Sequence, residues 1–141
     1  MNIKLLILLF GLSSISLFSQ NKIIEGKIFD ENFQFLENAF IETTDGKYYT
    51  KSNENGDFKI IIPSEYNELK VQFVGLHPYV IHLENRCFIN VILLNHFLIE
   101  FKTLKEEDKF YSKRRKRVNR KFKNILKNNK YRKDSYCLSA N

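Results

Sequence analysis

Short runs in which apolar and polar residues alternate dominate residues 23–94 and favour β-strands over helices. In the first run, Ile24 and Ile28 alternate with Glu25 and Lys27, so that one face of the strand is apolar. Six similar runs follow, at residues 39–41, 47–51, 58–62, 69–73, 79–83 and 87–94. Because short strands at such regular spacing are typical of two-sheet folds, we predict a mainly β protein, a seven-stranded antiparallel sandwich.

Two glycine-containing segments between these runs have the composition of tight turns. Thr44-Asp45-Gly46 closes the second run, and Asn53-Glu54-Asn55-Gly56 separates the third run from the fourth. The Asn-Gly pair favours a type I′ turn, because both residues tolerate positive φ. We therefore predict a β-hairpin around residues 53–56.

The pattern changes after His96, because residues 100–133 contain neither proline nor glycine and are rich in good helix formers. Five apolar residues share one side at helical spacing: Leu104, Tyr111, Val118, Phe122 and Ile125. Acidic residues precede basic ones, an order that suits the helix dipole. The segment predicts one long helix or two shorter ones, frayed from about Asn128. Whether the apolar stripe packs on the strands or stays free is left open.

The first residues resemble a secretory signal peptide. Lys4 follows closely on Met1, and residues 5–18 are apolar apart from three serines. This apolar stretch is shorter than the ~20 residues that span a bilayer. We predict cleavage after Ser19, with Ser16 as the alternative, and hence export of the chain.

Charge is distributed unevenly along the chain. The formal net charge of +7 combines +11 in residues 101–141 with −4 in residues 1–100. The chain is therefore a mildly acidic body with a strongly basic tail, and its charge bears on where it binds more than on catalysis.

Four segments in the predicted strands and turns follow the order of a known family pattern: residues 24–30, 36–39, 50–58 and 69–75. They resemble the carboxypeptidase regulatory-like domain, which is a transthyretin-like (Ig-like) sandwich. The family is common in exported proteins of Gram-negative bacteria, and it often stands before TonB-dependent receptors. The resemblance implies an architecture without catalytic residues. Together with the signal-like first residues and the change of pattern after His96, it predicts three parts: a signal peptide (1–19), a carboxypeptidase regulatory-like β-sandwich (20–97) and a basic helical tail (98–141) that is partly disordered at its end.

The chain departs from the family pattern at its first turn, where Phe33 and Phe35 stand in place of glycine and proline. We expect this turn to be built differently. We also expect one or both rings to fold back onto the sandwich, because clustered exposed aromatics are disfavoured.

No catalytic or metal-binding pattern is present, so we predict no catalytic residues, metal or cofactor. A zinc site needs converging His and carboxylate ligands, whereas His77 and His82 would face opposite sides of one regular strand, and His96 is the remaining histidine. The acidic residues Asp45, Glu54 and Asp57 lie beside turn glycines, but their spacing does not match an EF-hand loop.

Cys87 and Cys137 are the two cysteines of the chain. An oxidising compartment would allow a bridge between them. We favour free thiols, because Cys87 belongs to a strand whereas Cys137 lies in a polar segment, but the sequence leaves a disulfide open.

The sharpest feature is a cluster of cations in the predicted helix, which we propose as an anionic-surface site: Lys113, Arg114, Arg115, Lys116, Arg117, Arg120, Lys121 and Lys123. Five consecutive cations surround a helix, so they cannot all share one solvated face. A docked helix with its charges in water is the simpler interpretation. The functional one is contact with an anionic surface.

Export makes an anionic membrane, lipopolysaccharide or an acidic envelope protein the expected partner, and it makes nucleic acid an unlikely one. No small-molecule substrate is indicated. We therefore expect a non-enzymatic β-sandwich module of the cell envelope, periplasmic or associated with the outer membrane. The alternative is an accessory or regulatory subunit of an envelope peptidase or of a TonB-dependent uptake system.

Overall fold

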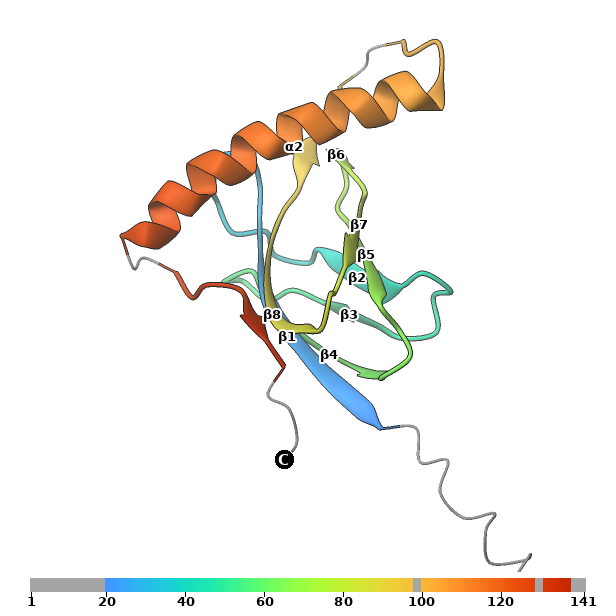
Figure 1. Cartoon of the computed structure of the whole chain (residues 1–141), viewed down its shortest axis with the longest axis vertical. Coiled ribbons are helices and arrows are strands. Elements are labelled where there is room, and N and C mark those ends of the chain that lie inside the picture. The colour runs from blue at the N-terminus through green and yellow to red at the C-terminus, as the bar shows by residue number, and fades with distance from the viewer. Residues whose placement is uncertain (1–19, 98–99, 129–130, 138–141) are drawn as a thin grey trace, which may run out of the picture.

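The computed structural model describes residues 20–97, 100–128 and 131–137, so the predicted signal peptide lies outside the described part. This part is mainly β, with ten strands in three sheets and one long helix (Figure 1). The elements are β1 (Asn21–Phe29), β2 (Phe40–Thr43), β3 (Tyr49–Lys51), β4 (Asp57–Pro63), β5 (Glu68–Gln72), β6 (Leu76–His77), β7 (Tyr79–His82), β8 (Arg86–Ile92), β9 (Leu94–Asn95), α2 (Leu104–Lys127) and β10 (Ser135–Tyr136).

The sheet topology corrects the predicted seven antiparallel strands. One four-stranded sheet has the order β10-β8-β1-β4, a second has the order β3-β2-β5-β7, and β6 pairs with β9. Strands β1 and β8 are parallel, in a register that runs from Glu25↔Phe88 to Phe29↔Ile92. The seven predicted strands correspond to β1 to β5, β7 and β8. The three additional strands have two residues each, too few for a periodic pattern.

The two four-stranded sheets share one hydrophobic core. Ile24 and Ile28 of β1 meet Ile41 of β2 and Leu69 of β5 in a single buried cluster. Gly26 lies between the two isoleucines, where a Cβ atom would come 2.1 Å from the carbonyl oxygen of Ile89. Glycine is therefore required for β1 to approach its parallel neighbour so closely.

The turn at Asn53–Gly56 forms as expected, but its type and its place in the fold differ from the prediction. Gly56 has a φ of 73°, whereas a type I′ turn would also require a positive φ at Asn55. The Asn53 side chain accepts hydrogen bonds from the backbone N–H groups of Asn55 (3.0 Å) and Asp57 (2.9 Å). The turn carries the chain from β3 in one sheet to β4 in the other, so it does not close a two-stranded hairpin.

Phe33 adopts the left-handed conformation in the first turn, with a φ of 62°. Asp30 stabilises this turn, because its carboxylate accepts the backbone N–H groups of Asn32 (2.8 Å) and Gln34 (2.9 Å). Phe33 folds back, but onto the helix α2 (Leu104–Lys127) instead of the expected sandwich, with its ring 5.5 Å from that of Phe122. Phe35 folds back only in part, since it lies 5.6 Å from Phe29 yet stays 42% exposed.

Helix α2 is a single helix, which ends close to the predicted position. The Thr103 hydroxyl accepts the backbone N–H of Glu106 (3.2 Å), and the Glu106 carboxylate accepts that of Lys102 (3.1 Å). The first bond caps a donor of the first helical turn, and the second holds the residue that precedes the cap. Of the predicted stripe, Tyr111, Val118 and Phe122 are buried, whereas Leu104 is 80% exposed.

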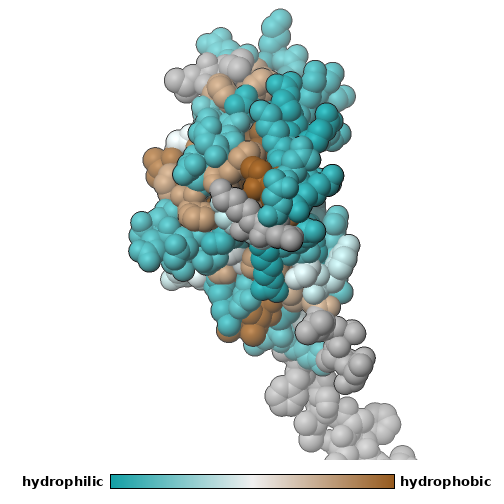
Figure 2. Space-filling model, turned by 90° about the vertical axis from the view of Figure 1, so that its left-hand side faces the viewer, coloured by the Kyte–Doolittle hydropathy of each residue, from teal (hydrophilic) through white to brown (hydrophobic). Residues whose placement is uncertain are grey.

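The helix is docked, which answers the question that the sequence left open. It lies across one end of the sheets (Figure 1). Its buried residues form a second hydrophobic cluster with Phe29, Ile92 and Leu94 of the strands. On the face shown in Figure 2, hydrophilic residues predominate and hydrophobic residues form patches between them.

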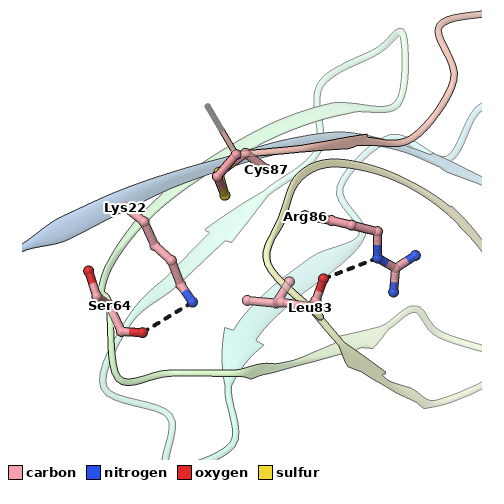
Figure 3. The surroundings of a disulfide bond; sticks show 6 residues. Lys22, Ser64, Leu83, Arg86 and Cys87 are labelled. Atoms are coloured by element: carbon pink, nitrogen blue, oxygen red, sulfur yellow. Dashed lines mark hydrogen bonds between the residues drawn. A yellow bond between two sulfur atoms is a disulfide. The ribbon is translucent and has the colours of Figure 1, made fainter. Parts of the chain in front are cut away.

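Cys87 and Cys137 form a disulfide, so the expectation of free thiols is wrong. Their Cα atoms lie 4.7 Å apart, within the bonding range. Strand β10 places Cys137 there by pairing with β8, and the Cys137 N–H donates to the carbonyl of Asn85 (2.9 Å). Lys22 of β1 lies close to Cys87 and donates to the carbonyl of Ser64 (Figure 3). The cysteines are 50 residues apart, and closing such a loop contributes about 4 kcal/mol in the chain-entropy account.

Candidate functional site

Arg114, one of the predicted surface-binding cations, faces the part of the molecule that the strands form, which we call the body. Its Nε and Nη2 atoms donate to the Glu31 carboxylate at 2.8 and 2.9 Å, an arrangement with two parallel bonds. The Glu31 side chain is only 9% exposed, and it also accepts the backbone N–H of Asn95 (2.8 Å). The guanidinium lies 4.3 Å from the centre of the Phe97 ring. Arg114 therefore fastens the helix to the body and is not available to an external surface.

Arg115 also faces the body. Its Nη1 donates to the carbonyl of Ile92 (2.7 Å), and its guanidinium lies 3.3 Å from the centre of the Tyr79 ring. Burial lowers the pKa of Arg115, and Tyr79 and Glu31 partly oppose that shift. Two of the five consecutive cations thus serve to attach the helix, which agrees with the argument that they could not share one solvated face.

The other six predicted cations are exposed: Lys113, Lys116, Arg117, Arg120, Lys121 and Lys123. No acidic residue occurs from residue 109 to residue 127, so the outer surface of this helical segment carries one sign of charge. At 1.5 Å per residue the segment extends over about 27 Å. The exposed side of α2 therefore carries a row of cations, whereas its other side packs on the strands.

The three histidines do not meet at one point, since the rings of His77 and His96 stack with 6.3 Å between their centres whereas His82 makes its contact elsewhere. His77 is in β6 and His82 in β7, so they do not share the single strand assumed in the sequence analysis. His77 stacks on Tyr111 with 3.6 Å between ring centres, whereas His82 pairs with Glu68 (2.9 Å). Within the described residues, no group of three or more His, Cys, Asp or Glu side chains could hold a metal ion.

The acidic residues at the turns stabilise local structure. Asp45 accepts hydrogen bonds from the hydroxyls of Thr43 and Tyr66, both at 2.7 Å, and from the backbone N–H of Lys47. These donors hold the pKa of Asp45 well below its usual range, and the same contact raises the pKa of Tyr66 to about 12. Asp57 pairs with Lys27 (2.7 Å).

Sequence reasoning missed an ionic contact that holds the segment after the helix. Asp134 accepts the backbone N–H of Asn90 (3.0 Å) and one of its side-chain N–H groups (2.8 Å). It also pairs with Arg86 Nη1 at 3.2 Å. Asp134 is the only acidic residue after Asp108, and that isolation within a basic tail was the available signal.

Comparisons with known proteins add no further assignment. A scan against protein-family models finds no match, and a search of curated proteins finds no similar sequence. Among the described residues, no helix combines the length and the apolar character needed to cross a bilayer.

Proposed function

We propose that this protein is an exported, non-enzymatic module of the cell envelope that binds anionic surfaces through α2. Its body would be a sandwich of the carboxypeptidase regulatory-like type, periplasmic or associated with the outer membrane. Support comes from the signal-like first residues, from the order of the family-like segments and from two four-stranded sheets with a common core.

The observation that carries the proposal is the division of cations on α2. Arg114 and Arg115 are engaged with the body, while Lys113, Lys116 and Arg120 lie on the outer face. At 100° per residue these three project within a narrow sector opposite the buried Val118. These three cations extend over about 10 Å along a rigid helix, at 1.5 Å per residue, and such a row matches a surface of repeated phosphates better than a single acidic side chain.

The expected contribution of this face is substantial. Each Lys or Arg near an anionic membrane surface contributes about 1 kcal/mol, so three cations contribute about 3 kcal/mol, or roughly a hundredfold in affinity. The attraction decreases as salt rises, because the Debye length falls to about 8 Å at physiological ionic strength.

The experiment compares two triple variants of the mature chain in sedimentation with vesicles of phosphatidylglycerol and phosphatidylcholine. The first variant combines Lys113→Gln, Lys116→Gln and Arg120→Gln, and the control combines Lys47→Gln, Lys51→Gln and Lys59→Gln on the body. We expect the first to weaken binding about a hundredfold at low salt, and the control to weaken it only a few fold. Equal losses in the two variants, or no binding by the unaltered protein, would contradict the proposal.

A further inference from the structure

A groove lies between α2, the strands β7 and β8, and the segment that follows the helix. Its volume is about 510 Å³, which falls within the usual range of ~300–1,000 Å³ for small-molecule sites. Its lining includes none of Lys113, Lys116 and Arg120, the three cations that carry the surface-binding proposal. An inference about this groove therefore goes beyond the surface binding proposed above.

The floor of the groove is apolar. Side chains from both strands and from the helix contribute to it: Ile81, Ile89, Ile92, Phe122 and Leu126. Four of them, all except Leu126, are exposed by 6% or less, so they form fixed walls of the groove. A ligand that covers this floor needs an apolar portion, because a polar ligand would lose hydration there without gaining partners.

Cations surround the opening. Lys123 and Lys127 stand one turn apart on α2, and Lys133 reaches the groove from the segment after the helix. Within the described residues, none of the three takes part in an ion pair, so their charges are not compensated. The one acidic group of the lining, Asp134, is already engaged by Arg86 and Asn90.

We propose that the groove binds a single-chain anionic amphiphile with a phosphate headgroup. The phosphate lies among Lys123, Lys127 and Lys133, and the acyl chain covers the floor beside Phe122. Two features of the groove together indicate this ligand class. The apolar floor favours an acyl chain, and the uncompensated cations at the opening favour an anionic headgroup.

The test measures binding of lauroyl lysophosphatidylglycerol below its micelle concentration by isothermal titration calorimetry. The control ligand is lauroyl lysophosphatidylcholine, which has the same chain but no net charge. The first variant combines Lys123→Gln with Lys127→Gln. The matched control combines Arg117→Gln with Lys121→Gln, which are also exposed, also four residues apart, and on the other side of the buried stripe. Each substitution replaces one good helix former with another.

We expect saturable binding of one glycerol lipid per protein. The Lys123/Lys127 variant should weaken it about tenfold or more, and the Arg117/Lys121 variant should change it less than about threefold. Equal effects of the two variants, equal affinity for the choline lipid, or no saturable binding would overturn the inference.

The same proteins distinguish this inference from surface attachment. If the groove is wrong, monomeric lipid does not bind, yet sedimentation with vesicles still depends on Lys113, Lys116 and Arg120. If surface attachment is wrong, those three substitutions leave vesicle sedimentation unchanged, yet the monomeric lipid still requires Lys123 and Lys127.

Discussion

The two faces of α2 carry the same kinds of cation and place them in opposite surroundings. On the inner face, Arg114 lies against a carboxylate that is only 9% exposed, with an aromatic ring beside the guanidinium. On the outer face, Arg120 is exposed and takes part in no ion pair within the described residues. Cations of the first kind contribute to stability because removing them strands a buried charge, whereas cations of the second kind contribute to recognition.

Removing a ring from the inner face should have the largest effect. Phe122 is 5% exposed and lies 5.0 Å from Phe29 and 5.5 Å from Phe33, measured between ring centres. Phe122→Ala should reduce the free energy of unfolding by about 4 kcal/mol, through lost burial and the cavity that remains. Urea denaturation measures this loss. The control is Lys121→Ala, a change at an exposed position of the same helix, which should change the free energy of unfolding by less than about 0.5 kcal/mol. Similar losses in both variants would mean that the helix is not docked by this face.

His77 of β6, which packs against α2, should also make the free energy of unfolding depend on pH, with a smaller effect than that of Phe122→Ala. His77 stacks on Tyr111, its Nε2 lies 3.7 Å from a Glu107 oxygen, and its Nδ1 is buried without a partner among the described residues. Burial lowers the pKa of His77. The carboxylate of Glu107 opposes this shift, and Arg115 and His96 add to it.

Because the folded pKa of His77 lies below the ordinary value, the unfolded chain binds the proton more readily. The contribution of His77 to stability is therefore complete above pH ~6.5, and it is lost as the pH falls from there toward the folded pKa. Unfolding measured between pH 7 and 5 should show this loss in the unaltered protein and not in His77→Phe. His82→Gln should retain it, since that histidine is exposed. If the pH dependence of the free energy of unfolding is the same in His77→Phe as in the unaltered protein, His77 is not the group that causes it.

The strands of the body were predictable because their signal is local. Alternation at Ile24 and Ile28, or at Leu69 and Val71, reflects one buried face, and the structure buries those side chains completely. The parallel pairing of β1 with β8 was not predictable, because nothing in either strand specifies a partner more than sixty residues away. The all-antiparallel expectation failed for that reason.

The cation cluster shows the same division between local and distant information. The sequence predicted that Lys113–Arg117 would surround a helix, but it could not show which of these cations would be engaged. Arg114 is engaged because it meets Glu31, which is 83 residues away in the sequence. The disulfide was missed for a comparable reason, since the two-residue strand β10 that brings Cys137 to Cys87 has no periodic pattern.

The most direct test of the division between the two faces compares Arg114→Gln with Arg120→Gln, an identical change on opposite faces. For each variant, both urea unfolding and affinity for phosphatidylglycerol vesicles are measured at physiological salt. We expect Arg114→Gln to reduce the free energy of unfolding by about 2 kcal/mol, a value discounted for partial exposure of the pair, with less than a twofold change in affinity. Arg120→Gln should change stability by less than about 0.5 kcal/mol and weaken vesicle binding about fivefold. If both substitutions shift the same quantity to the same extent, the two faces do not differ in role and the account is wrong.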